Sequence, residues 1–362
     1  MSSRTCLWAL LLLALAAACP AIDAMDFTVP EDEYLEATVN DARKRAARYI
    51  LERERVLPTL DATYHAAAAD ALALSRDLLE AGEVGQAYQI ARDAYRRHPY
   101  STAAAGLTHQ LFRCTALAGD YSRARRHLID TNERFPAYAD IDLLMQEGLL
   151  VAELVQAHGP FIDLDAPHPR EVINEEMILA PNVANPYFYY LSLYGDRHEI
   201  APQATIGLAR SFLIKGSDRL EKLGLARHYY ERFLERFPTH ELAFTALCEY
   251  ALSYLIAYRG DVYDLGVVQT AKSIIEHQAR HHADEIPERL ALIEQYRALI
   301  RRWWQDRDLQ VGRWYHGRER YAAAQIYFRQ VVARDSQSQQ GRTALRLLGE
   351  ARKHLDAGEP AE

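Results

Sequence analysis

The sequence has few cysteines and no long basic run, and each scarcity excludes a class of protein. Its formal net charge of −8 argues against nucleic acid as the main partner. Of the four cysteines, Cys6 and Cys19 lie near the N-terminus, whereas Cys114 and Cys248 each fall on an apolar helical face. We therefore interpret the latter two as small buried side chains, with a single disulfide between them as the alternative.

Motifs of the common enzyme classes are also missing, including G-x-S-x-G, H-E-x-x-H, the P-loop and the dinucleotide-binding fingerprint. His277 and His281 lie four residues apart on one helical face, but no motif fixes a third ligand. The alternative for this pair is a polar helix end. Trp303 and Trp304 suggest a sugar or peptide site, although neighbouring helical positions point apart, so one of them should belong to the core. We expect a non-enzyme without cofactor, metal or small-molecule substrate.

Glycine and proline are few and cluster between periodic stretches, which is typical of an all-helical chain. Residues 62–100 and 101–136 each show an apolar helical pattern, a short polar turn and a closing proline. This combination predicts helical hairpins of the tetratricopeptide (TPR) kind. Small or aromatic residues should line the second helices of the hairpins, namely Ala87, Ala124, Ala226 and Tyr230.

Residues 308–336 form the clearest hairpin pattern in the chain. We expect Gly312 and Ala324 to allow the two helices to approach closely, with Tyr315 and Phe328 filling the space around that contact. A lone amphipathic hairpin cannot bury both of its faces, so the pattern implies neighbours of the same kind. The fold class predicted is all-α, as a TPR-like helical-hairpin solenoid in two lobes.

The N-terminal segment carries an export signal. Arg4 precedes an apolar run, Leu7–Leu15, which is followed by small residues and Cys19. The run is short for a membrane span. The sequence Leu-Ala-Ala-Ala-Cys is similar to a bacterial lipobox, so we expect lipidation at Cys19. The alternative is cleavage after Ala21 or Ala24, which would give a soluble periplasmic protein.

Composition and periodicity divide the chain into six segments. These are a lipoprotein-type signal peptide (1–19), a lead-in with an amphipathic helix (20–58), an N-terminal TPR lobe (59–157), an irregular insert rich in proline and aromatic residues (158–200), a C-terminal TPR lobe (201–355) and a loose tail (356–362).

Two groups of residues are candidates for partner binding. One is the aromatic run in the insert, which is either a short buried helix or an exposed docking surface; aromatic residues more often belong to a core. The other surrounds the turn of the last hairpin, where arginine can pair with carboxylates while its stem packs. The residues are Tyr187, Tyr189, Tyr190 and Tyr194 in the first group, and Arg313, His316, Arg318 and Arg320 in the second.

The stretch from Asp308 to Ala324 shares Val311, Tyr315, Ala322 and Ala323 with the pattern V-x-x-[FY]-Y-x-[KR]-x-x-Y-x-A-A after an acidic residue, and on these residues it resembles the BamD (YfiO) family of outer-membrane assembly lipoproteins. The similarity extends over about 224–355, with Asp335 and Ser336 standing where the family has an aromatic residue and proline. The resemblance implies a non-catalytic TPR scaffold, lipid-anchored on the periplasmic face of the outer membrane. Its implied partners are envelope assembly subunits and peptide segments of client proteins. The alternative is a periplasmic TPR adaptor of another envelope machine, acting in cell division or on peptidoglycan.

Overall fold

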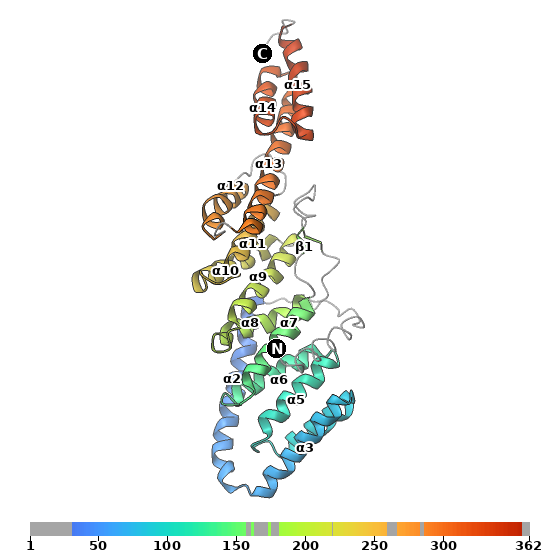
Figure 1. Ribbon diagram of the computed structural model, residues 1–362, viewed down its shortest axis with the longest axis vertical. Coiled ribbons are helices and arrows are strands. Elements are labelled where there is room, and N and C mark those ends of the chain that lie inside the picture. Colours follow the sequence, from blue (N-terminus) through green and yellow to red (C-terminus); the bar gives the residue numbers. More distant parts are fainter. Residues whose placement is uncertain are drawn as a thin grey trace. The chain divides into compact units, whose positions relative to one another are not determined.

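The computed structural model describes residues 31–156, 161–162, 173–174, 181–218, 220–258, 266–282 and 286–356, and these are almost entirely helical (Figure 1). The all-α class predicted from the sequence is confirmed. One short antiparallel pair, β1 (Phe161–Ile162) and β2 (Ile173–Asn174), is the strand content of this part of the chain. Across the same residues, no helix is both long and apolar enough to cross a membrane.

The chain divides into two compact units, Met1–Pro160 with Glu175–Ser211 and Phe161–Asn174 with Phe212–Glu362. In the first unit, the helices between residues 62 and 194 each pack against the next helix in sequence (Figure 1). Its helices are α2 (Glu31–Val56), the short η1 (Leu57–Thr59), α3 (Ala62–Glu80), α4 (Val84–Arg97), α5 (Ala104–Leu117), α6 (Tyr121–Arg134), α7 (Ile141–Gln156), α8 (Pro181–Tyr194), the short η4 (Gly195–His198) and the first part of α9 (Ala201–Asp218).

Local sequence explains the hairpin turns of this unit. Gly82 and Gly119 take positive φ angles of 83° and 76°, a conformation that glycine adopts without a steric penalty. Asp120 then caps α6 by accepting a hydrogen bond from the backbone N–H of Arg123 at 3.1 Å. On the second helices, Ala87 and Ala124 are fully buried, as their predicted role in close helix contact requires.

The amphipathic lead-in helix α2 packs along α6 and α8. Its apolar stripe, which includes Val39, Ala42 and Ala46, is buried. Tyr49 fixes its register, because the hydroxyl donates to the carbonyl of Pro99 at 2.6 Å. The helix is therefore part of the first unit.

The segment predicted to be an irregular insert is helical over α8, which corrects the interpretation of that part of 158–200. Proline is compatible with a first helical turn, where Pro181 lies, and the run that follows Pro186 contains neither glycine nor proline. Tyr187, Phe188 and Leu191 are fully buried in this helix. The aromatic run is therefore the short buried helix that was one of the two alternatives for it.

The second unit begins within α9 and continues through helices that again pack on their sequence neighbours (Figure 1). Ala226 and Tyr230 are fully buried, and the Tyr230 hydroxyl donates to Glu249 at 2.9 Å. The helices are α10 (Leu220–Arg236), α11 (Ala243–Ile256), α12 (Gly266–Ser273), a π-helical turn η5 (Ile274–Gln278), a 3-10 turn η6 (Ala279–His282), α13 (Pro287–His316), α14 (Tyr321–Arg334) and α15 (Gln339–Asp356).

The last hairpin has the predicted turn but a longer first helix, because α13 runs without a break from Pro287. Ala324 and Phe328 are fully buried and pack with residues of α13 and α15. Phe328 fills the space beside Gly312, as the sequence predicts. A methyl group on Gly312 would lie 2.5 Å from a ring carbon of Phe328, so the glycine makes room for that ring.

Replacing Ala324 with leucine should lower the free energy of unfolding by about 1–3 kcal/mol, because a closely packed core cannot take three more carbon atoms without moving α13 or α15. Urea denaturation measures the effect. Ala322→Leu is the matched control, since Ala322 is exposed on the same helix. Equal midpoints for both variants would contradict the packing described for Ala324.

The signal segment and Cys19 lie outside the described residues, as does the chain beyond Asp356. Lipidation at Cys19 therefore stays a prediction.

Candidate docking surface

The turn between α13 and α14 is held in a strained conformation. Backbone N–H groups of Arg318 and Arg320 both donate to the carbonyl of Tyr315, at 3.1 and 3.0 Å. Glu319 then adopts φ 62°, two residues before the next helix. Gly82 and Gly119 occupy the corresponding point in the α3–α4 and α5–α6 turns. A side chain in this conformation costs about 1 kcal/mol, and such strain is concentrated at functional sites.

Beside this turn stands an exposed group of aromatic side chains and one arginine. The Trp314 side chain is 50% exposed, and the guanidinium carbon of Arg318 lies 4.2 Å from its ring centroid. Tyr315 meets the indole edge-on at 4.8 Å and stacks on Tyr327 at 5.6 Å. We call Trp314, Tyr315, Arg318 and Tyr327 the Trp314 stack. The contacts fix the indole while leaving half of it in water.

The surroundings of the Trp314 stack are basic. Arg313, Arg318 and Arg320 are all exposed. From Pro287 to Asp356 the chain has 14 arginines and lysines against eight aspartates and glutamates, which gives +6 in a protein whose total is −8. A surface of this charge attracts acidic partners.

The fourth predicted residue of this group, His316, lies differently. Its ring is half-buried and packs against Tyr321 and Phe328, with centroids 5.2 and 6.2 Å apart. Its Nε2 atom is buried and has no hydrogen-bond partner within the part of the chain that the structure describes. His316 is thus a packing residue beneath the turn, whereas the three arginines surround it.

The aromatic run of α8 is mainly core. Tyr187 and Tyr190 are fully buried, and their hydroxyls bond to the Tyr121 carbonyl at 2.7 Å and to the Asn132 amide at 2.7 Å. Burial raises the pKa of both phenols well above the usual value. Neither side chain is exposed to a partner, which corrects the docking interpretation for these two residues.

Tyr189 and Tyr194 are partly exposed, but they do not form an open aromatic surface. Tyr194 packs on Tyr190 at 4.6 Å, and Arg43 of α2 lies over its ring at 5.3 Å. The four tyrosines belong to the first unit and the Trp314 stack to the second, so the predicted binding residues form two separate groups.

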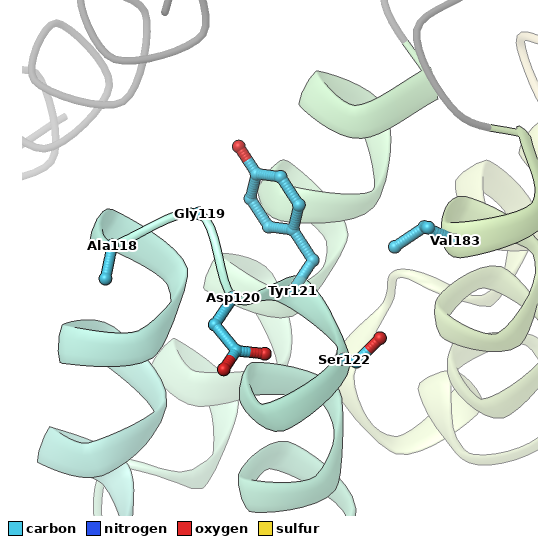
Figure 2. Close-up of a pocket in the computed structure, with 6 residues that line it drawn as sticks. All are labelled: Ala118, Gly119, Asp120, Tyr121, Ser122 and Val183. Atoms are coloured by element: carbon cyan, nitrogen blue, oxygen red, sulfur yellow. The ribbon is translucent and has the colours of Figure 1, made fainter. Parts of the chain in front are cut away.

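A hollow of about 330 Å³ lies at the α5–α6 turn (Figure 2). Figure 2 shows the turn residues Ala118 to Ser122 on one side and Val183 of α8 on the other. The one carboxylate in its lining, Asp120, is already engaged, because it caps α6 and lies 3.2 Å from the Arg123 guanidinium. The hollow is a consequence of the turn and brings together no reactive pair of side chains.

Side chains suited to metal or thiol chemistry are dispersed. Within the described ranges, no group of three or more histidines, cysteines or carboxylates is placed to hold a metal ion. His277 and His281 are exposed in η5 and η6. Cys114 and Cys248 are buried free thiols, and burial raises the pKa of each to about 12, so neither is a thiolate at neutral pH.

The docking residues predicted from the sequence surround this turn, but they do not include Trp314 and Tyr327. The signal for Trp314 was available in the helical period. Val311, Gly312 and Tyr315 were assigned to one face, which leaves the intervening Trp314 pointing away from it.

Comparison with known proteins was made by family and by sequence. No protein-family model matches the chain, and no curated protein matches it either.

Proposed function

We propose that this protein is a non-catalytic helical scaffold, a two-lobed solenoid of TPR type, that holds a protein partner through the Trp314 stack. The observation that carries the proposal is the indole of Trp314, half exposed and yet fixed between Arg318 and Tyr315. Exposure of a large aromatic ring to water is unfavourable, and a partner that covers the ring gains the free energy of burying it.

The composition of the surface favours binding to protein. Tryptophan, tyrosine and arginine are the residues most enriched among those that dominate interface energies. Because the ring contacts already restrict Trp314 and Arg318, little side-chain entropy remains to be lost on association. The excess of arginine around the stack favours a partner with an acidic patch facing it.

We further propose that the scaffold is anchored by lipid at Cys19 on the periplasmic face of the outer membrane and serves in outer-membrane protein assembly or insertion. Its partners would be envelope assembly subunits, with client peptide segments bound elsewhere on the repeats. The support is the resemblance of Asp308–Ala324 to the BamD family and the apolar segment Leu7–Leu15 before Cys19. The alternative, a lipid-free periplasmic adaptor for cell division or peptidoglycan, would use the same docking chemistry with a different partner.

Replacing Arg313, Arg318 and Arg320 together by alanine should leave helicity and thermal stability nearly unchanged but weaken retention of the envelope partner. Trp314→Ala should weaken it by at least about 30-fold, equivalent to about 2 kcal/mol at a dominant interface residue. Co-purification from solubilised envelopes, with mass spectrometry of the retained proteins, measures the loss and separates the two proposed machines.

The matched control replaces three exposed arginines of α15 by alanine, which removes the same amount of charge. These are Arg342, Arg346 and Arg352. If both triple variants lose the partner equally, the effect is net charge and not the Trp314 stack. Undiminished partner yield from the Trp314→Ala protein would remove the proposed docking surface.

A further inference from the structure

A second feature, distinct from the Trp314 stack, lies where the π-helical turn η5 meets α13 in the second unit. A pocket of about 310 Å³ is lined there by Ile275, Ile300 and Trp304 among others. This volume is near the lower end of the range for small-ligand sites. The π-helical turn supplies two of the lining residues, Ile275 and Glu276, and such turns occur frequently at functional sites.

The carboxylates in the pocket wall are already paired. Arg297 donates to both oxygens of Glu276, at 3.0 and 2.5 Å, and also pairs with Glu294. Arg280 donates to Glu276 as well, at 2.8 Å. The two negative charges are therefore compensated, and the network holds the wall in place.

Two cations of the lining have no carboxylate partner within the described residues. Lys272 is exposed, and its ammonium group lies 4.9 Å from the centroid of the Trp304 ring. Arg301 is exposed on α13. With Arg297 included, three cations and two carboxylates line the pocket, which leaves it one positive charge in excess.

Trp304 supplies both an apolar surface and an unused donor. Its indole N–H is buried and has no acceptor in the described part of the chain. A buried donor without a partner is unfavourable.

We propose that this pocket binds a carboxylate group carried on a small apolar body. Lys272 and Arg301 attract the carboxylate, while Ile275, Ile300 and the Trp304 ring cover the apolar part. Inorganic phosphate would leave the apolar walls unused, and a neutral analogue would leave the cations unpaired. The carboxylate arrives either on a free organic acid or as an acidic side chain of a partner protein.

Benzoate is the probe, titrated into the full-length protein and followed by calorimetry and by tryptophan fluorescence. We expect saturable binding that weakens with salt. Benzamide, the neutral isostere, should bind at least about tenfold more weakly because it lacks the charge that the two cations attract. Inorganic phosphate should also bind at least about tenfold more weakly, because it leaves the apolar walls uncovered. Lys272→Met should reduce benzoate affinity by a similar factor.

Arg352→Gln is the control, because it removes an exposed cation from α15. The proposal would be overturned if benzamide or phosphate bound as tightly as benzoate, or if benzoate binding did not saturate. Equal losses of benzoate affinity in the Lys272→Met and Arg352→Gln proteins would also overturn it. A short peptide with one glutamate identifies the source. Competition with benzoate supports a carboxylate on a partner protein, and benzoate binding without competition supports a free acid. The Trp314→Ala protein should bind benzoate normally, which keeps this result separate from the docking test.

Discussion

Replacing Glu147 with alanine is expected to lower the free energy of unfolding by about 3–5 kcal/mol, because it leaves two buried basic groups without their shared acceptor. Glu147 lies on α7 with its side chain 12% exposed. Its partners are Arg113 and His109 of α5, which are 17% and 4% exposed. Breaking a desolvated pair costs far more than removing a pair on the surface.

The geometry explains why one carboxylate serves two partners. Arg113 donates through Nη2 to one Glu147 oxygen at 2.6 Å and through Nε to the other at 3.0 Å. His109 Nε2 lies 2.9 Å from Glu147, and His109 Nδ1 lies 3.2 Å from the Tyr138 hydroxyl. Alanine removes the contacts that Glu147 makes with Arg113 and His109, leaves the contact of His109 with Tyr138, and opens a cavity between α5 and α7.

The difference between wild type and variant should depend on pH. Burial by itself raises the pKa of Glu147, but hydrogen bonds from His109 and Arg113, with their charges, outweigh it and hold the pKa below the usual value. The unfolded chain therefore takes up the proton first as the pH falls. The stabilisation is present above the unfolded pKa of about 4.3 and is lost as the pH drops through the folded pKa. The two proteins should converge in stability below about pH 4.

His109 adds to the acid sensitivity of the wild type. Burial lowers the pKa of His109 by more than its hydrogen bond to Glu147 raises it. The unfolded chain then binds a proton that the folded chain does not, so stability falls as the pH drops below about 6.5. Urea unfolding followed by far-UV circular dichroism, repeated at several pH values, measures both effects.

Glu80→Ala is the matched control for Glu147→Ala, since Glu80 is exposed at the end of α3 and should change stability by less than about 0.5 kcal/mol. Equal midpoints for the two variants at pH 7 would show that the α5–α7 network contributes nothing. A difference that persists unchanged at pH 3 would contradict the pKa argument.

The helical class and the small contact positions were predictable from the sequence because close helix packing demands alanine at a regular spacing. Ala87, Ala124, Ala226 and Ala324 were identified from this pattern, and each is fully buried. The physical cause is local, since a side chain larger than a methyl group at these points would separate the helices. No knowledge of distant partners was needed.

Buried polar residues were not predictable in the same way. The stretch that includes Gln305 and Asp308 reads as a solvated helix face, yet these side chains are 2% and 1% exposed. Gln305 donates to the carbonyls of Val331 and Asp335, and Asp308 pairs with Arg307 and Arg334. Their acceptors and partners come mainly from another helix, so only the folded chain shows why they are inside.

The candidate docking surface and the pocket were likewise predictable only in part. The arginines of the last turn were found from charge and turn position, whereas the Trp314 stack depends on Tyr327 coming from a second helix. The pocket at Trp304 required the π-helical turn, which no sequence pattern signalled. Of the tryptophan pair, Trp303 is buried against Tyr258 and Trp304 lines the pocket, as opposite helical faces require.

The end of α14 shows how the chain manages without the proline expected there. The Asp335 carboxylate accepts hydrogen bonds from the backbone N–H groups of Gln337 and Ser338, at 2.9 and 3.2 Å. The Asp335 carbonyl accepts from buried Gln305 at 3.0 Å. These side-chain and backbone hydrogen bonds hold the turn after α14, where a proline would otherwise end the helix.

This closed turn makes Gly341 the most sensitive position of α15. A methyl group added there would lie 2.1 Å from the Asp335 carbonyl oxygen and 2.9 Å from backbone carbon atoms of Ser336. The obstacle is backbone, and Gln305 holds the carbonyl in place. Gly341→Ala must therefore shift the turn and break that hydrogen bond, which leaves the buried Gln305 amide with one of its two acceptors, the Val331 carbonyl. We expect the free energy of unfolding to fall by about 2–4 kcal/mol.

Gly349→Ala on the same helix should have the opposite effect. Nothing lies within 4 Å of a methyl group added at Gly349, and alanine restricts the unfolded chain, so stability should rise by about 0.5–1 kcal/mol. Urea unfolding monitored by the fluorescence of Trp303, Trp304 and Trp314 on α13 reports on this part of the protein. If both variants changed the free energy of unfolding in the same direction, Gly341 would not lie in the close contact with the Asp335 carbonyl that requires glycine at this position.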